Sequence, residues 1–383
     1  MFDPDRHRLD IQVGFEPAVR FACPECGATG CPVHDTTAKE WRHLNFFEHE
    51  AYLHAKVPRV RCDRHGVRQV GVPWAREGSG FTLLFEALAM AMMREMPVKA
   101  AARIVGEHDT RLWRTLLHYV DQARASEDHS GVSKVGVDET SHRRGQSYVT
   151  LFADLERSKV LFATPGRDST TVARFKDDLE THGGAATQIR EFSMDMSEAF
   201  RRGVQTNFEG AEITVDKYHV VQLLNEAMDE IRRSEQRSHP ELKNSRYWWL
   251  RRPSKLTAEQ QRGLAEHRRR YRTMARAYQL KLEFDELWEQ PIDDAELYLT
   301  DWCLRVFRSR LPLDPLERFV DTLVVNWERI LRWFQSRISN GILEAINSLV
   351  QAAKRRARGY RSDRHYIAMI YMTAGKLNFQ LPT

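Results

Sequence analysis

The sequence has few cysteines and no long apolar run. Its five cysteines are an odd number, which argues against a disulfide scaffold, and four of them lie within the first 62 residues. The most apolar stretch, residues 81–93, is shorter than a membrane span and contains Glu86. The N-terminus lacks the apolar core of a signal peptide. These absences argue against a membrane protein or a secreted disulfide-rich protein and predict a cytoplasmic location.

Length and charge are compatible with a multidomain protein that meets nucleic acid. The chain has 383 residues, 42% of them hydrophobic and 29% charged, so it can bury the cores of two or three domains. Its net charge is +5 and its pI about 8.9. A mildly basic net charge does not identify a nucleic-acid-binding protein by itself. The function must therefore be inferred from local motifs.

The first 130 residues divide into two predicted modules. Residues 1–75 are rich in cysteine and histidine and contain short strands. Residues 79–125 are predicted to be helical, because apolar side chains recur at helical spacing, Pro97 begins a second helix and Asp109 is placed to cap a third. Three short helices with a glycine-containing turn before the last are typical of a helix-turn-helix; the alternative is a plain three-helix packing unit.

The remaining chain changes from a linker to mixed structure and then to helices. Three β-rich runs are followed by an alternation of helix and strand, which predicts a mixed sheet with helices on its faces. Residues 218–331 are almost wholly helical, and residues 340–359 form a further long helix. The expected strands are residues 135–140, 147–155, 159–164, 189–194 and 212–215, with helices at 170–182 and 198–208.

Four acidic residues are placed to meet at one edge of this sheet. Asp138, Asp195 and Asp216 stand where strands should end, and Glu344 lies on the late helix. Asp195 and Asp216 also precede helical runs, so the sequence leaves open that either is a helix cap. Asp138 and Glu139 must point to opposite faces of their strand. Asp138 is the candidate because the flanking valines give its strand the parity of a buried edge.

The late helix has a polar stripe although it is largely apolar. Glu344, Asn347 and Gln351 fall on nearly the same face, whereas a lone glutamate there would be a solvated surface residue. Converging carboxylates suit Mg²⁺, which prefers a few carboxylates plus waters and substrate oxygens. Two such ions about 3.5–4 Å apart activate an attacking oxygen and stabilise a leaving oxygen on phosphorus. The acids therefore predict a site for two Mg²⁺ (or Mn²⁺) ions.

Two short cysteine and histidine pairs indicate a second, separate metal site. Cys23 and Cys26 form one pair, Cys62 and His65 the other, each with two intervening residues. Tetrahedral zinc takes four nitrogen or sulfur ligands from two such knuckles, and a closed set of four is structural. Cys31 and His34 are a rival second pair, ranked lower because they lie so close to the first knuckle.

A dense basic run follows Glu344. An ordinary charge run is a solvated helix face, but this one directly follows a candidate metal ligand, and cations so placed can neutralise DNA phosphates. The predicted DNA-binding residues are Lys354, Arg355, Arg356, Arg358 and Arg361.

Together these motifs resemble the DDE transposases of the bacterial ISL-three insertion-sequence family. The resemblance covers essentially the whole chain: the Cys/His knuckles, the helix-turn-helix, the motifs around the four acids, and the basic run after Glu344. One departure is His65, where many members have cysteine; histidine is still a competent zinc ligand.

The resemblance implies an α/β fold in which a zinc ribbon and a helix-turn-helix precede a ribonuclease-H-like core with an all-helical insertion. The implied boundaries are 1–75 for the ribbon, 76–130 for the helix-turn-helix, 131–220 and 332–383 for the core, and 221–331 for the insertion. In such a core the acids lie on the first strand, after the fourth strand and on a late helix. By strand count these are Asp138, Asp195 and Glu344, with Asp216 the alternative second ligand if that count is one strand out.

Three further residues are implied as accessory to the active site. Asp216 and His219 match an Asp-x-x-His motif that lies near the active site in related transposases, and Asn347 shares the helix of Glu344.

The resemblance also implies the function. The chain is expected to bind the terminal inverted repeats of its own element, with residues 110–123 in the major groove, and to cleave and transfer DNA strands. Its expected partners are double-stranded DNA and further copies of itself, and its expected location is the nucleoid. The alternatives are a catalytically inactive, domesticated DNA-binding regulator and a stand-alone nuclease. Three convergent carboxylates argue against the regulator, since binding alone does not need them.

Overall fold

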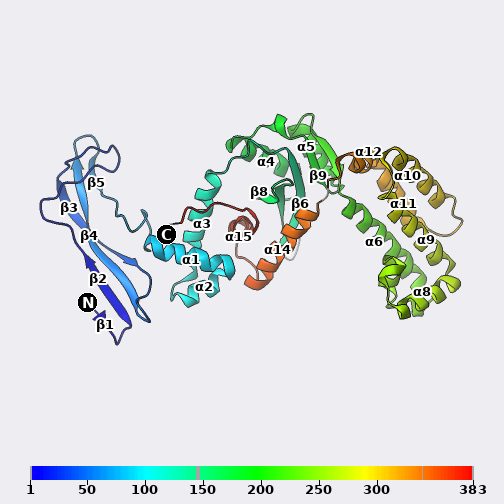
Figure 1. Cartoon of the computed structure of the whole chain (residues 1–383), viewed down its shortest axis with the longest axis horizontal. Helices are drawn as coiled ribbons and strands as arrows, with labels where there is room; N and C mark the ends of the chain where they lie inside the picture. Colours follow the sequence, from blue (N-terminus) through cyan, green and yellow to red (C-terminus); the bar gives the residue numbers. More distant parts are fainter. Residues whose placement is uncertain (1, 144–146, 339, 382–383) are drawn as a thin grey trace. The chain divides into compact units, whose positions relative to one another are not determined.

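The computed structural model describes residues 2–143, 147–338 and 340–381 (Figure 1). The chain divides into two compact units. The first contains the chain up to Ser126 together with residues 353–360 and the segment from Leu377 on, and the second contains residues 127–352 and 361–376. Among the described residues, no helix is long and apolar enough to cross a membrane.

The first unit begins with a five-stranded sheet. The order is β1-β2-β4-β3, and β5 pairs with the far end of β4. β4 is one long strand that also includes Pro58; this proline lies between the end of the β2 pairing at Ala55 and the start of the β5 pairing at Arg59, where a missing N–H is tolerated. The strands are β1 (Phe2–Asp3), β2 (Arg8–Val13), β3 (Val33–Arg42), β4 (Glu50–Cys62) and β5 (Gly66–Gln69).

Three helices follow this sheet in the first unit: α1 (Leu83–Glu95), α2 (Val98–Ile104) and α3 (Asp109–Ala125). The fully buried Glu86 of α1 accepts hydrogen bonds from Arg76, Ser79 and, across the helices, Tyr119 of α3. A buried charge needs such partners, so this network fixes α1 against α3. The predicted cap of the third helix was wrong by one residue, because the ring of His108 accepts the N–H of Thr110.

The second unit is built on a sheet of order β10-β9-β6-β7-β8. β7 is antiparallel to both β6 and β8, while β6, β9 and β10 are parallel. The strands are β6 (Lys134–Arg143), β7 (Ser147–Asp154), β8 (Lys159–Pro165), β9 (Glu191–Met194) and β10 (Glu212–Val215), and a 3₁₀ turn (Ala186–Gln188) precedes β9. The predicted order of strands and helices is confirmed, but β6 continues beyond Asp138, which the sequence placed at its end.

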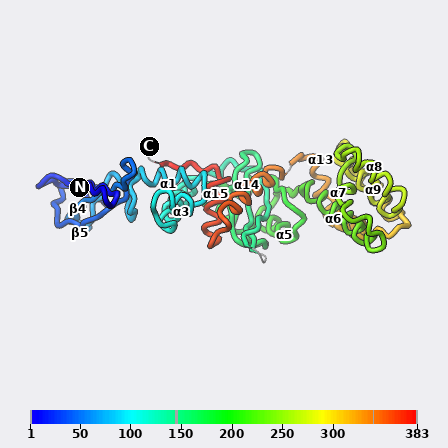
Figure 2. The backbone as a smooth tube through the Cα atoms, turned by 90° about the horizontal axis from the view of Figure 1, so that it is seen from below, coloured from blue at the N-terminus to red at the C-terminus, as the bar shows by residue number. Residues whose placement is uncertain are grey.

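Helices cover both faces of this sheet. On one face, α4 (Ser169–Thr181) and α5 (Glu198–Asn207) bury their apolar sides, and the ring of Phe175 stacks on Phe152 of β7 at 4.4 Å between centroids. On the other face lie α14 (Gly341–Ala357) and α15 (Asp363–Ala374), side by side in Figure 1 and Figure 2. Leu343 of α14 packs so closely on Gly136 of β6 that a Cβ there would lie 2.6 Å from its methyl group.

The segment between β10 and α14 is an all-helical insertion with its own core. Trp249, Tyr278 and Trp302 are buried there, so the tryptophan pair at 248–249 contributes to the core of the insertion. The helices are α6 (Lys217–Gln236), α7 (Arg246–Leu250), α8 (Ala258–Arg270), α9 (Arg272–Leu287), α10 (Ile292–Phe307), α11 (Asp314–Val325), α12 (Trp327–Leu331) and α13 (Trp333–Ser336), with 3₁₀ turns at Pro240–Leu242 and Pro253–Lys255.

Candidate metal centre and nucleic-acid interface

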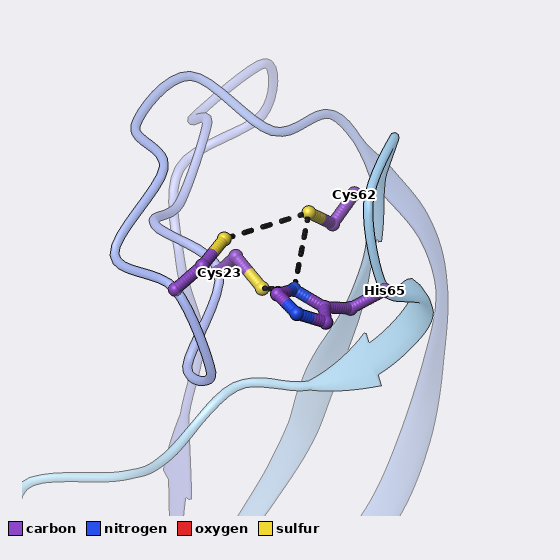
Figure 3. A group of neighbouring side chains, drawn as sticks. Cys23, Cys62 and His65 are labelled. Atoms are coloured by element: carbon purple, nitrogen blue, oxygen red, sulfur yellow. Dashed lines mark hydrogen bonds between the residues drawn. The ribbon is translucent and has the colours of Figure 1, made fainter.

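The four predicted zinc ligands come together at the end of the first sheet. Figure 3 labels three of them, Cys23, Cys62 and His65. The ligand atoms of all four lie within 4.8 Å of one another. Cys23 Sγ is 3.7 Å and Cys62 Sγ 3.8 Å from His65 Nδ1, and Cys26 Sγ is 3.8 Å from Cys62 Sγ. With Zn–S bonds near 2.3 Å, a tetrahedral site separates its ligands by about 3.8 Å. The donor set and its spacing therefore fit zinc.

The two knuckles also supply the electrostatics that thiolate ligands need. Backbone N–H groups of Cys26 and Glu25 lower the pKa of Cys23, and those of His65 and Arg64 lower the pKa of Cys62. Glu25 lies 3.8 Å from His65 Nε2, and a carboxylate on the outer nitrogen orients a histidine ligand. Glu25 was not anticipated, although its place inside the first knuckle was visible in the sequence.

The rival pair of Cys31 and His34 does not join this group. Cys31 Sγ lies 3.4 Å from the carbonyl oxygen of Ala28, and His34 Nδ1 lies 3.3 Å from the guanidinium of Arg61. The compact ligand group contains neither residue.

The strand register brings three predicted acids to one edge of the second sheet. Gly136 of β6 pairs with Ser193 of β9, which pairs with Thr214 of β10. Extending this register by two residues brings Asp138, Asp195 and Asp216 to the same level. Partners in register share a face, and neighbouring strands lie about 4.8 Å apart. The three acids are therefore neighbours, with Asp195 in the middle.

The face on which Asp138 lies is the one covered by α14. Asp138 has the same parity as Gly136, against which Leu343 of α14 packs, and its Oδ2 accepts a hydrogen bond of 2.5 Å from Asn347 of that helix. Its Oδ1 accepts the N–H of Glu139. Glu139 has the opposite parity and interacts with Arg167.

The electrostatic contacts of the acids form two pairs with a histidine between them. Asp138 interacts with Asp195, and Glu344 interacts with Asp216, while His219 interacts with Asp138, Asp216 and Glu344. These side chains are near one another without forming a closed cluster. Among the described residues, the groups whose ligand atoms all lie within 4.8 Å do not include them.

Burial and nearby charges raise the pKa values of three of these carboxyls, those of Asp138, Asp216 and Glu344. Burial raises the pKa of Asp138, and the negative charge of Asp195 raises it further. Burial likewise raises the pKa of Asp216, and burial followed by the charge of Asp216 raises that of Glu344. Carboxyls that disfavour ionisation together are stabilised by a bound cation, so the residues fit a divalent metal.

Asp216 and Asp195 are both held by backbone groups, in different ways. Asp216 is 2% exposed, and its Oδ1 accepts the N–H of Asn340, the residue just before α14. Its other oxygen, Oδ2, is buried with no hydrogen-bond partner among the described residues. Asp195 accepts the N–H of Ser197, whose own hydroxyl caps α5. Asp216 therefore tethers the start of the helix that contains Glu344.

A polar network fixes the middle of α14 to β6. Gln351 Nε2 lies 2.8 Å from Thr140 Oγ1, 3.0 Å from the carbonyl oxygen of Ser141 and 3.2 Å from Tyr366 Oη of α15. Thr140 is two residues after Asp138 on β6, so this network aligns the two elements that present Asp138 and Glu344. The sequence suggested Gln351 as part of a polar stripe, but it gave no signal for Tyr366.

Removing this tether should loosen the site. We expect Gln351→Ala to lower the free energy of unfolding by about 1–2 kcal/mol and to slow the DNA cleavage that the family resemblance implies by about tenfold or more, because α14 loses its alignment with β6. Thermal unfolding and a cleavage time course measure the two effects. Ser348→Ala, at an exposed position of the same helix, is the control and should change neither. A variant with lowered stability and an unchanged cleavage rate would contradict the positioning role.

The site should also leave a pH signature on stability. Burial, together with the charge of Asp195, raises the pKa of Glu139 from 4.5 to about 7. Between these values the folded state binds more protons than the unfolded state, so this carboxyl makes stability fall as pH rises.

Glu139→Gln should therefore stabilise the protein at about pH 8 by about 1 kcal/mol, a figure reduced for solvent screening of a partly exposed group, and should do much less near pH 5. The measurement is thermal unfolding in magnesium-free buffer with zinc retained. A larger gain in stability near pH 5 than near pH 8 would contradict the expected direction of this pH dependence.

The basic run ends α14. Arg355, Arg356, Arg358 and Arg361 are exposed, whereas Lys354 is partly buried and burial lowers its pKa. Arg358 and Gly359 have positive φ values of 58° and 92°, which terminate the helix. The solvent-facing side of α3 also contains an exposed arginine, Arg114. The arginine side chains at these positions are therefore open to solvent.

Three segments of the chain match known protein families. Residues 20–65 match the zinc-finger of the transposases IS204/IS1001/IS1096/IS1165, which supports a structural zinc. Residues 71–120 match the helix-turn-helix domain of transposase family ISL3, and residues 135–370 match the transposase domain of that family. The helix-turn-helix match supports DNA binding, and the transposase domain implies a divalent metal at the catalytic site.

Full-length relatives agree with these matches. The transposase for insertion sequence element IS1557 of Mycobacterium tuberculosis is 27% identical over 96% of this chain and 89% of its own length. The transposase for insertion sequence element IS1001 of Bordetella parapertussis is 26% identical over 96% of this chain and 92% of its own. Because the ISL3 transposase domain alone matches more than half of the sequence, the chain belongs to the ISL3 family of transposases.

Proposed function

We propose that this transposase uses a DDE site in a ribonuclease-H-like core to cleave the ends of its element and join them to target DNA. Support comes from the sheet, which has five strands in the order β10-β9-β6-β7-β8. β7 is antiparallel to the strands on either side of it, and β6, β9 and β10 are parallel to one another, which is the arrangement expected of that core. The helical insertion lies between the last strand and the helix with the third acid.

The observation that carries the proposal is the register that places Asp138 beside Asp195, under a helix that contains Glu344. These three carboxylates would hold two Mg²⁺ ions. When bound, the ions supply an activated oxygen nucleophile and a stabilised leaving oxygen. No covalent protein–DNA intermediate is needed, since a freed 3′-hydroxyl of the element attacks the target phosphate in line.

The neighbouring side chains have supporting roles. Asp216 tethers α14 through Asn340, and His219 places a polar ring among Asp138, Asp216 and Glu344. Asn347 donates to Asp138 and thereby orients its carboxylate. The basic residues Lys354, Arg355, Arg356, Arg358 and Arg361 hold the DNA backbone near the cut.

The first unit recognises the ends. The zinc ribbon (residues 1–75) and the helix-turn-helix (76–130) bind the terminal inverted repeats, with residues 110–123 in the major groove, where exposed Arg114 can reach base edges. The catalytic core comprises 131–220 and 332–383, interrupted by the insertion at 221–331. Two ends must be joined in one event, so the active form is a dimer or larger assembly on DNA, in the cytoplasm at the nucleoid. The inactive-regulator alternative is not favoured.

The test is a reaction with duplexes that contain the element end. With Mg²⁺ the protein should cut at the end and join the new 3′-hydroxyl to a second duplex. Cutting without joining, even with paired ends, would indicate a nuclease. Binding without either reaction would indicate the regulator.

A further inference from the structure

A hollow in the helical insertion is lined by arginines. It lies between the end of α8 and the start of α9, with a volume of about 550 Å³; the two helices are labelled in Figure 1. Four arginines line it, at positions 268, 269, 272 and 276, together with Gln279 and Leu311. Its remaining lining residues are the small side chains of Ala265 and Ala275, and no carboxylate contributes. We call it the arginine groove.

The charges of the groove have no carboxylate partner in the part of the chain that the structure describes. In the described parts of the chain, none of the four arginines forms an ion pair, whereas the adjacent Arg270, outside the groove, lies 3.6 Å from Glu241. Arg268 lies over the ring of Tyr278, and Arg276 donates to the carbonyl oxygen of Arg305. These contacts orient the side chains and leave their charge uncompensated.

Helix electrostatics explain only half of the cluster. The C-terminal end of a helix attracts cations, which accounts for Arg268 and Arg269 in the last turn of α8. Arg272 is the first residue of α9, where the same dipole disfavours a cation. An arginine at that position therefore points to an anionic ligand outside the protein.

The groove is built on a packed support. The ring of Trp248 lies against Gly263 of α8, where an added Cβ would be 2.6 Å from it, and the ring of His267 lies tilted beside the same ring at 5.2 Å between centroids. The buried Trp249 packs edge-on against Tyr278 of α9 at 5.7 Å. The two helices that present the arginines are thus held by a common aromatic core.

We propose that the arginine groove binds the phosphate backbone of duplex DNA, as a contact surface separate from the helix-turn-helix. Duplex DNA has one negative charge per 1.7 Å or so of its axis, and guanidinium groups bind phosphate oxygens in a bidentate manner. The alanines let a sugar-phosphate strand approach closely. Contacts from guanidinium groups to phosphate oxygens read no base edge, so the contact is independent of sequence. The proposal rests on DNA binding by this transposase and not on the assignment of its catalytic acids.

The test replaces all four groove arginines with glutamine and measures binding to a short duplex of unrelated sequence over a range of salt concentrations. Each phosphate contact contributes about 0.9 to the magnitude of the slope of log affinity against log salt, so losing four contacts should reduce that magnitude by about 3.6, and affinity at moderate salt should fall at least tenfold. A matched control replaces four exposed cations of the insertion outside the groove, Arg237, Lys243, Lys255 and Arg262. Its slope should change by less than about 1. Thermal unfolding confirms that both variants are folded.

An unchanged slope in the groove variant, or an equal change in the control, would overturn the proposal. A small-anion site would instead be stabilised by millimolar inorganic phosphate with an unchanged DNA slope, and that result would also overturn it. This experiment measures binding without cleavage, and its variants leave Asp138, Asp195 and Glu344 unchanged. An incorrect assignment of the catalytic acids would therefore not change the result of this experiment. An incorrect groove proposal would likewise not change the result of the cleavage test.

Discussion

Asp138→Asn is expected to abolish metal-dependent strand cleavage, with a loss of about 1,000-fold or more. Such a loss corresponds to about 4 kcal/mol of transition-state stabilisation. The physical reason is charge: asparagine preserves the shape and can still accept the N–H of Glu139, but it removes the anionic ligand that Asp138 would offer to a cation. Cleavage of an end-containing duplex in Mg²⁺ measures the effect, with DNA binding as the control, which should remain unchanged.

The neighbouring acids extend this prediction and decide between two assignments. Asp195→Asn should be as severe as Asp138→Asn, because the register places Asp195 between the outer two acids. Asp216→Asn should cost only about tenfold, since the amide oxygen can still accept the N–H of Asn340 and keep α14 in place. If Asp216→Asn were the severe variant and Asp195→Asn the mild one, Asp216 would be the second metal ligand.

The elements at this edge of the sheet could be predicted from the sequence because strands, helices and turns leave patterns in neighbouring residues. Runs of β-branched residues, apolar residues at helical spacing and short polar turns can each be recognised within a few residues. The order of strands and helices around Asp138 and Asp195 could therefore be predicted. The strand boundaries were less accessible: β6 continues past Asp138 because its second half pairs with β7, as far as Arg143 with Ser147. That pairing is a tertiary event that the local pattern does not encode.

The supporting contacts were hidden for the same reason. Tyr366 meets Thr140 across 226 positions of sequence, and Asn340 meets Asp216 across 124. Neither pair has a spacing rule, since both depend on how the insertion returns the chain to the sheet. The arginines of α8 and α9 were visible as composition, but only the fold shows that four of them line one hollow free of carboxylates.

Cys62→Ser is expected to release zinc and to unfold the ribbon, with the loss of specific binding to the element ends. Structural zinc contributes about 10–16 kcal/mol in isolated finger peptides, which is as large as the whole stability of a typical domain. Here the compact ligand group ties the turn at Cys23 to the β4–β5 turn at Cys62 and His65. With only three of its four ligands left, the site is not expected to retain the zinc ion.

Metal content per chain and end-binding affinity measure this result, and two matched variants make it specific. Cys31→Ser should keep one zinc ion per chain, because the Cys31 thiol lies against the Ala28 carbonyl oxygen, outside the ligand group. His65→Cys should keep it too, since a thiolate can replace the imidazole in a tetrahedral site. The second unit should unfold at an unchanged temperature in all three variants, because its core shares no residue with the ribbon. Loss of zinc from Cys31→Ser with retention in Cys62→Ser would transfer the site to the rival pair.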